Sequence, residues 1–317
     1  IADNISLTDK LFKLFEPPTA YLASIQQPTG SRFGGDALFN GKNRKLGARM
    51  KYFFNPEISK LKDVKKDSIS LKIFDNDRLI RTIYIKSPDK KGIHVISWNM
   101  DEKGPKYPKR KIRKNNREGS GVYVKPGKYK LIMEVGELKD ETSIIVKSDP
   151  RLSISIKTIE DSYKTGKKLE EFLEIVDKAT IQLAKSLLIA KDFEKSLITN
   201  DSVLYKNQIK LSKEIVKEIN SVQDLFFGEI DKRQGIIRSP KENVLSRIRK
   251  AYYYSISRPN GVTITENILI KQAKSELDFS LNKVNAFFNQ GWKQYQLKME
   301  KLSISPFKPI QKFNINN

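Results

Sequence analysis

Two patterns of apolar and polar residues divide the chain near Pro150. Between residues 46 and 148, apolar and polar residues alternate in short runs, as they do in half-buried β-strands. The run 68–74 alternates most regularly, and the run 79–85 returns after a polar turn, so the two predict a hairpin. About six or seven such runs, spaced roughly 8–12 residues apart, predict an immunoglobulin-like or fibronectin-III-like β-sandwich over 46–149.

Beyond Pro150, apolar residues recur every three or four positions, which is the period of an amphipathic helix. These stripes predict four helices, the last of them capped by Thr263 or Thr265. Because the stripes are long and close to a heptad repeat, we expect an elongated antiparallel helical bundle over 150–302. The predicted helices cover about residues 158–198, 203–227, 241–257 and 263–302.

The two ends of the chain carry loop chemistry. Pro and Gly pairs within residues 1–45 predict an irregular linker that packs on the sandwich or on a missing N-terminal domain. Leu11, Leu14 and Phe15 form one short apolar group there, which fits either a helix turn or a strand. Residues 303–317 contain two prolines and are expected to be extended. The predicted class is therefore α+β in two domains.

Two local motifs and two single residues in the β region have specific interpretations. Asp75-Asn76-Asp77 lacks the glycine and glutamate spacing of a calcium-binding EF-hand loop, so we interpret it as the hairpin turn. Lys125-Pro126-Gly127-Lys128 predicts a type II turn, with positive φ at Gly127. Trp98 is expected in the sandwich core, and His94 is expected as a partly exposed strand residue.

Composition restricts the possible chemistry. The chain has 317 residues, no cysteine and one histidine, which excludes disulfides, thiolate catalysis and cysteine-based zinc sites. We expect no catalytic residue, metal or cofactor. No apolar run approaches the roughly 18 residues of a membrane span, so no transmembrane segment is predicted. The formal net charge of +23 is spread over both halves and defines no single site.

The densest cluster of charge is a basic run with eight positive charges in fifteen residues and no acid. Such a run suits an acidic protein surface, phosphates or lipid headgroups, but we favour a solvated loop between strands. If it binds anything, we expect a protein rather than a nucleic acid, because Tyr107 is its only aromatic residue. The run comprises Lys103, Lys106, Lys109, Arg110, Lys111, Arg113, Lys114 and Arg117.

Aromatic and acidic clusters in the helical region also need an interpretation. Tyr252, Tyr253 and Tyr254 are consecutive on a predicted helix, so at least one must face solvent or a partner. Trp292 is a candidate rim or interface residue. An acidic group on the first helix flanks the apolar stripe and is expected to be solvated rather than to bind metal. Its members are Glu170, Glu171, Glu174 and Asp177.

Several segments, taken in order, resemble a known family. They are Phe15-Glu16-Pro17, residues 47–52, residues 92–99, Val124 to Tyr129 and Asp149-Pro150-Arg151. Their order and spacing resemble the region that follows the β-propeller in bacterial sortilin-like proteins with BNR-type repeats, many of which carry a glycosyl hydrolase label. The basic insert between Asn99 and Gly121 departs from that pattern.

The resemblance implies that a propeller precedes Ile1 and that the parent protein is exported. Since the sequence starts at Ile1 rather than methionine, we expect that the natural N-terminus was removed. The leading hypothesis is a non-catalytic protein-interaction or scaffold module in a periplasmic, cell-surface or extracellular complex, and any enzymatic activity would reside in the propeller. One alternative is polyanion binding through residues 103–117. A second, by resemblance only, is an accessory domain of a carbohydrate-active hydrolase that uses Tyr84, Tyr107 or Tyr123.

Overall fold

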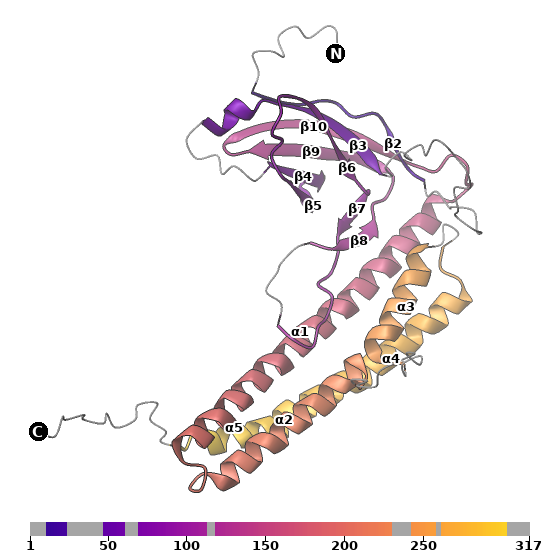
Figure 1. The fold of residues 1–317 in the computed structure, drawn as a ribbon. Coiled ribbons are helices and arrows are strands. Elements are labelled where there is room, and N and C mark those ends of the chain that lie inside the picture. The colour runs from indigo at the N-terminus through magenta and orange to yellow at the C-terminus, as the bar shows by residue number, and fades with distance from the viewer. Residues whose placement is uncertain are drawn as a thin grey trace, which may run out of the picture. The chain divides into compact units, whose positions relative to one another are not determined.

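The computed structural model describes residues 11–23, 47–60, 69–112, 118–229, 242–257 and 261–302. Within them, several β-sheets precede four long helices, which confirms the α+β class (Figure 1). The chain forms two compact units. The first unit comprises residues up to 105, 118–167 and 256–262, and the second comprises 106–117, 168–255 and 263 onward. The domain bounds at 149 and 150 stay a prediction.

The first unit contains a three-stranded antiparallel sheet in the order β1-β3-β6. Direct pairing of Lys51 with Val95 and of Phe53 with Ile93 fixes the register between its two long strands. Because paired residues share a face, one face carries these four side chains while Met50, Tyr52 and their neighbours lie on the other. The strands are β1 (Phe12–Leu14), β3 (Ala48–Phe54) and β6 (Gly92–Trp98).

A five-stranded sheet in the order β2-β10-β9-β4-β5 lies in the same unit. It is antiparallel except at β2, which pairs in parallel with β10. A separate two-stranded sheet, β7-β8, flanks the basic run, because β7 ends at Lys103 and β8 begins at Ser120. The strands are β2 (Ala20–Leu22), β4 (Ile69–Asp75), β5 (Arg78–Ile85), β7 (Asp101–Lys103), β8 (Ser120–Tyr123), β9 (Gly127–Val135) and β10 (Leu138–Ser148).

One core cluster joins side chains from both larger sheets. Met50 and Trp98 come from the three-stranded sheet, and Leu71, Leu131 and Ile144 come from the five-stranded sheet. Trp98 is fully buried, as predicted, and its indole N–H donates to the carbonyl of Asp101 over 2.9 Å. His94 is half-buried on β6 beside the ring of Tyr52, which agrees with its interpretation as a partly exposed strand residue.

Of the two turns predicted in this unit, one is confirmed and the other is wrong. The hairpin turn between β4 and β5 is confirmed, since Asn76 adopts a positive φ of 54° and Asp75 pairs with Arg78. The type II turn at Lys125 to Lys128 is wrong, because Gly127 is not among the described glycines with positive φ. Gly127 instead begins β9 and pairs with Val146, which requires extended backbone.

The N-terminal segment also differs in part from the expected irregular linker. Residues 12–14 and 20–22 form the short strands β1 and β2, each added to a different sheet. Leu14, one member of the predicted apolar group, is therefore part of a strand rather than of a helix turn, and it is buried in the core. Residues 1–10 and 24–45, which complete the predicted linker, and the tail 303–317 lie outside the described residues.

A tight turn connects the last strand to the first helix. The carboxylate of Asp149 accepts hydrogen bonds from the backbone N–H of Arg151 at 3.0 Å and from its guanidinium at 2.6–3.1 Å. These bonds lower the pKa of Asp149 to about 2. The helix α1 (Ile156–Asp201) then starts, with the hydroxyl of Ser155 accepting from the N–H of Thr158. The change of period near Pro150 thus corresponds to a real change from strand to helix.

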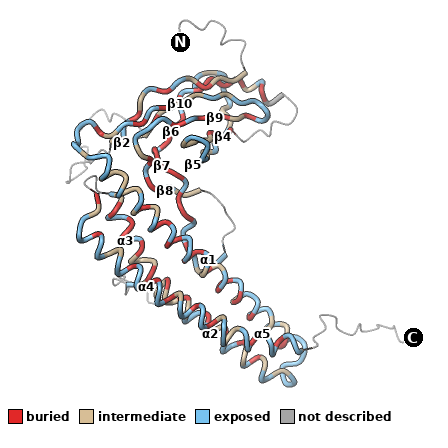
Figure 2. The backbone as a smooth tube through the Cα atoms, turned by 180° about the vertical axis from the view of Figure 1, so that it is seen from behind, coloured by how far each residue is buried: buried red, intermediate tan, exposed pale blue. Residues whose placement is uncertain are grey.

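Three further helices follow, each with an identifiable start. Asp201 caps the turn into α2 (Lys206–Phe227) by accepting from two backbone N–H groups at 2.9 Å. Asn243 and Ser246 bond each other's backbone at the start of α3 (Val244–Ser257). Thr263 forms a capping box with Glu266 at α4 (Ile264–Phe287), which confirms one of the two predicted caps. Buried residues recur along one side of these helices (Figure 2).

The predicted single helix over 263–302 is interrupted. A π-helical turn, η3 (Phe288–Trp292), separates α4 from α5 (Lys293–Met299). Such turns insert one extra residue and are common at functional sites. Apolar residues on both sides of η3 still lie on the buried side of the helices, because Val284 and Phe287 in α4 and Tyr295 in α5 are all buried. No described helix has the length and apolarity to cross a membrane.

Candidate interaction surface

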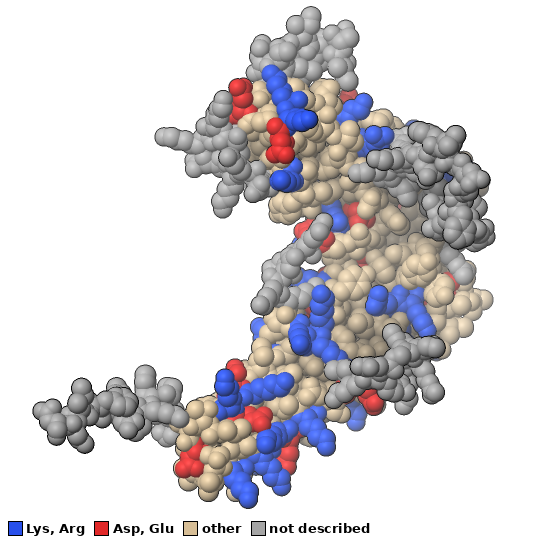
Figure 3. Space-filling model, viewed as in Figure 1, with Lys and Arg blue, Asp and Glu red and all other residues tan. Residues whose placement is uncertain are grey.

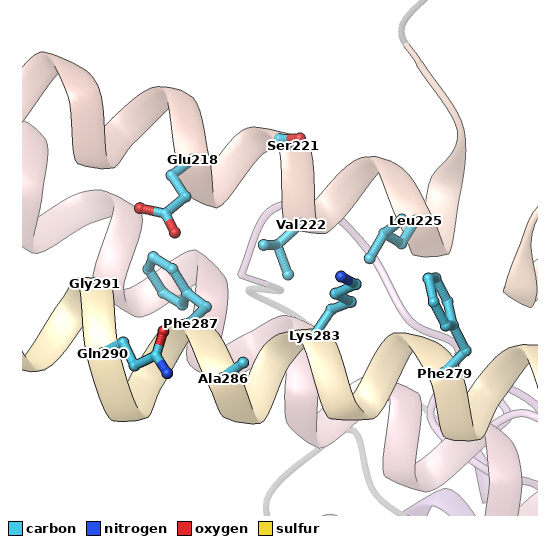
Figure 4. A pocket seen from close by; sticks show the side chains of 10 residues that line it. All are labelled: Glu218, Ser221, Val222, Leu225, Phe279, Lys283, Ala286, Phe287, Gln290 and Gly291. Atoms are coloured by element: carbon cyan, nitrogen blue, oxygen red, sulfur yellow. The ribbon is translucent and has the colours of Figure 1, made fainter.

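A groove lies between α2 and α4 in the second unit and encloses about 350 Å³. Helix α2 lines it with Glu218, Ser221, Val222 and Leu225. The opposite wall, from α4 and η3, contains Phe279, Lys283, Ala286, Phe287, Gln290 and Gly291. Glu218 lies near Gly291 at one end and Leu225 near Phe279 at the other, so the two helices run in opposite directions (Figure 4). We call this feature the α2–α4 groove.

Phe279 adds an exposed aromatic ring to one end of this groove. It lies outside the apolar stripe of α4, whose members Ala273, Leu277 and Val284 are buried, and its side chain is 53 % exposed. The ammonium group of Lys283 lies 5.5 Å from the centre of its ring. The sequence analysis missed Phe279, although an aromatic residue outside the stripe, followed by Lys283 and Ala286 at helical spacing, was an available signal.

A glycine lines the end of the groove near η3. A Cβ atom at position 291 would lie 2.9 Å from the carboxylate of Glu218, so glycine allows this close approach. Trp292, the predicted rim or interface residue, is half-buried and contacts the rings of Phe287, Phe288 and Tyr295 at centroid distances of 5.5–6.4 Å. These aromatic contacts pack the π-helical turn against its neighbours.

The tyrosine triplet on α3 divides between core and surface. Tyr252 is buried, and its hydroxyl donates to the carboxylate of Glu170 over 2.9 Å. Tyr253 is 63 % exposed and Tyr254 is also exposed, and their rings meet edge to face at 5.6 Å. The prediction that at least one of the three faces outward is therefore confirmed.

The solvated acidic group expected on α1 needs correction. Glu171 and Glu174 are exposed, but Glu170 and Asp177 are buried. Glu170 is buried because α3 covers it and supplies the hydroxyl of Tyr252. A stripe on one helix does not reveal which of its flanks a later helix will cover. Among the described residues, no group of three or more potential ligands can hold a metal ion.

The basic run is partly anchored rather than wholly solvated. The guanidinium of Arg110 lies 2.6 Å from the carboxylate of Asp224, donates to the carbonyl of Gly228 and lies 5.2 Å from the ring centre of Phe227. The expectation of a solvated loop is therefore wrong for Arg110, which binds the C-terminal end of α2. That end is favourable for a cation, because its carbonyl groups lack helical partners.

The other members of the basic run are not brought together into one site. Lys103 pairs with Glu118 over 3.1 Å, while Lys106, Lys109 and Lys111 are exposed. Arg113, Lys114 and Arg117 lie outside the described residues. On the face drawn in Figure 3, basic side chains are spread over the helices, in agreement with the even distribution of charge along the sequence.

The first unit holds a charged cluster that the sequence analysis missed. Glu102 on β7 is only 5 % exposed at its side chain, yet it accepts from Arg78 at 2.7 and 3.0 Å and from the hydroxyl of Tyr163 at 2.6 Å. Lys167 lies 3.4 Å away. Burial acts to raise the pKa of Glu102, but the hydrogen bonds of Arg78 and Tyr163 and the nearby positive charges outweigh it, so the pKa is lowered.

The pKa of Asp101, the neighbour of Glu102, is shifted in the opposite direction. Burial raises its pKa, and the charge of Arg81, whose guanidinium lies 3.4 Å away, offsets this only in part. Arg81 also donates to the carbonyls of Glu102 and Gly119, and so ties β5 to β7 and to the residue that precedes β8. We assign this cluster to the fold of the first unit, where it joins β7 to the first turns of α1.

A comparison with protein-family models finds no match, and neither does a comparison with curated proteins. A solved structure named pT26-6p is similar at 11 % identity, covering 81 % of this chain and 46 % of its own, with a TM-score of 0.17. The chain thus spans less than half the length of that structure, and a similarity this low carries no argument about fold or function.

Proposed function

We propose that this chain is a non-catalytic protein-interaction module that binds a partner protein through the α2–α4 groove. The observation that carries the proposal is the exposed ring of Phe279 beside an apolar cavity. Aromatic side chains are enriched at the centres of interfaces, because each buries a large apolar area there. The charged residues Glu218 and Lys283 lie beside the apolar lining, an arrangement typical of an apolar centre with a polar rim.

An amphipathic helix fits this groove best. The wall from Phe279 to Gln290 contains twelve residues, whose eleven steps of about 1.5 Å span about 16–17 Å, or about three helical turns. A partner helix lying between α2 and α4 would bury residues spaced at i, i+3 or i+4, and i+7. Its rim would carry a basic residue for Glu218 and an acidic residue for Lys283, because both charges flank the cavity.

Site-specific photo-crosslinking tests this function. A benzophenone amino acid replaces Phe279 in one variant and Leu188 on α1 in another, because the two side chains have similar exposures of 53 % and 51 %. We expect a single partner polypeptide to be captured from position 279, with the crosslinked site in a helical segment, and none from position 188. No capture at 279, or the same proteins captured from both positions, would contradict the proposal.

The larger context is a separate part of the proposal. We infer that the sheets form an immunoglobulin-like sandwich, that the helices form an elongated antiparallel bundle, and that the chain follows a β-propeller in an exported sortilin-like protein. The buried Trp98 and the hydroxyl of Tyr129, which donates to the carbonyl of Lys125 over 2.6 Å, support the sandwich. The same tyrosine-to-backbone bond occurs in immunoglobulin-type domains. Reading the coding sequence upstream of Ile1 tests the context, since four-stranded repeats are expected there.

Polyanion binding is a second candidate. Lys106, Lys109 and Lys111 are exposed on a segment that Arg110 anchors, so their charges would be held in place for a phosphate-rich ligand. Binding to DNA or anionic vesicles would then decrease steeply with salt and be lost when the three lysines are replaced by serine. A lack of measurable binding at physiological salt rules this candidate out. Sugar binding by the exposed Tyr84 or Tyr123 rests on the family resemblance, and a glycan array tests it.

A further inference from the structure

The strand β6 forms an open edge of the three-stranded sheet. Within the described part of the chain, β6 pairs only with β3, and its seven residues contain no proline, no lysine and no register shift in that pairing. Natural edge strands are normally protected by such features, because unpaired backbone groups recruit strands from other chains. Among the described residues, none of these protective features is found at the edge of β6.

Two outward side chains of β6, those of Ile93 and Val95, are apolar. Ile93 and Val95 are 43 % and 48 % exposed, although both belong to β-branched types that usually lie in sheet interiors. They occupy alternate positions and so lie on the same face of the sheet, beside the open edge. A strand added to β6 would bury part of both side chains while it satisfies the free backbone groups.

The other sheet edges are different. β1, opposite β6 in its sheet, has only three residues. β5, at the edge of the five-stranded sheet, is tied to the β7–β8 segment: Arg81 donates to the carbonyls of Glu102 and Gly119, and the N–H of Thr82 donates to Glu118. Long length, exposed β-branched side chains and an open side thus coincide at β6 among the described strands.

We propose that β6 binds an extended, acidic segment of another protein, which adds to the sheet as a fourth strand. The segment would carry β-branched residues beside Ile93 and Val95, and acidic residues flanking them on the same face. This contact lies in the first unit and is independent of the α2–α4 groove.

Charge favours an acidic partner over a second copy of this chain. β3 and β6 contain no acidic residue, and Arg49 and Lys51 share the face of Ile93 and Val95. An added strand would lie about 10 Å from β3, slightly farther than the Debye length of about 8 Å at physiological salt, so its carboxylates would feel a screened attraction. A second copy would instead bring the same basic residues and a further formal charge of +23.

Peptide binding to the full chain tests this inference. The probe is the peptide Glu-Thr-Val-Thr-Val-Thr-Glu, compared with an isomer in which the two valines are adjacent and with a version that has lysine in place of glutamate. Hydrogen exchange of the amides of residues 92–98 is measured with and without each peptide. We expect the first peptide to slow exchange about tenfold at saturation and the other two to have no effect.

Variants and the oligomeric state complete the test. Val95→Asp should abolish protection, while Ile145→Asp should retain it, because Ile145 is 46 % exposed on β10, which has neighbours on both sides. Absence of protection by the first peptide, or equal protection by the isomer, would overturn the strand site. Equal protection by the lysine version would overturn the acidic partner. If sedimentation shows a dimer of the chain, and Val95→Asp abolishes that dimer, the acidic partner is overturned and the occupant of the β6 edge is a second copy of this chain.

Discussion

The hydroxyl of Tyr163 in α1 donates a hydrogen bond of 2.6 Å to the carboxylate of Glu102 in β7, 61 residues earlier in the chain. The bond links the start of the helical region to the sheet region within the first unit. Since Arg78 donates to the same carboxylate, loss of the tyrosine hydroxyl leaves Glu102 buried with fewer donors.

We predict that Tyr163→Phe lowers the free energy of unfolding of the first unit by about 1–2 kcal/mol, because a hydrogen bond to a buried charge is lost. Urea unfolding followed by fluorescence measures this change. In a Trp292→Phe background Trp98 is the only tryptophan, and it reports on the first unit. Tyr84→Phe serves as the control, since Tyr84 is exposed. Equal stability of both variants would show that the bond contributes little.

Opposite pKa shifts at Asp101 and Glu102 predict opposite effects on acid stability. The pKa of Glu102 is lowered by its partners, so ionised Glu102 stabilises the fold above its unfolded pKa of about 4.3, and this stabilisation is lost as pH falls through the folded pKa. Burial raises the pKa of Asp101, so the fold gains stability from Asp101 as pH falls through that raised value.

We therefore expect Glu102→Gln to reduce the stability lost between about pH 7 and about pH 2.5, and Asp101→Asn to increase it. Urea unfolding of the two variants and the parent at both pH values gives the comparison. The change in the free energy of unfolding between the two pH values is compared, rather than the stability at one pH. Each substitution also removes a partner of Arg78 or Arg81, which changes stability at both pH values. Changes of the same sign in both variants would contradict this assignment.

Arg110 is predicted to anchor the basic segment to α2. Arg110→Ala should reduce the free energy of unfolding of the second unit by about 1 kcal/mol, as expected for a partly exposed ion pair with an added ring contact. Trp292 fluorescence in a Trp98→Phe background reports on that unit. A double-mutant cycle with Asp224→Ala isolates the pair. Lys109→Ala, an exposed neighbour, should change stability by less than about 0.5 kcal/mol, and an equal loss there would refute the anchor.

Gly166 is predicted to be required by packing. Alanine is favoured over glycine inside a helix by about 1 kcal/mol, but a Cβ at position 166 would lie 2.5 Å from the buried Cγ1 of Val122. We expect Gly166→Ala to destabilise the first unit by about 1–2 kcal/mol. In the double variant with Val122→Ala, the total loss should be smaller than the sum of the two single losses. A stabilised Gly166→Ala would show that helix propensity decides instead.

Local patterns predicted the elements because local physics determines them. Alternation along residues 69–85 follows from a sheet with one buried face, and the turn at Asn76 is encoded within three residues. The helix stripes and the capping box at Thr263 are equally local. The type II turn failed at Gly127 because pairing with Val146, a long-range contact, overrides the preference of the Pro-Gly dipeptide.

The surface features could not be predicted in the same way. Arg110 and Asp224 are 114 residues apart, and no local pattern connects them. Glu170 lies on the flank of its stripe, and α3 decides whether it is solvated or buried. Phe279 was detectable as an aromatic residue outside its stripe, but the groove exists only because α2 lies beside α4. Contacts between distant segments therefore define the candidate site.

Affinity for the partner segment captured at position 279 is the most direct test of the interaction-module function. The segment is synthesised as a peptide and titrated calorimetrically into the chain and into its Phe279→Glu and Leu188→Glu variants. We predict that Phe279→Glu weakens binding about thirtyfold or more, the loss expected for a central aromatic contact, whereas Leu188→Glu changes it less than about twofold. Equal affinity of all three proteins would contradict binding in the α2–α4 groove.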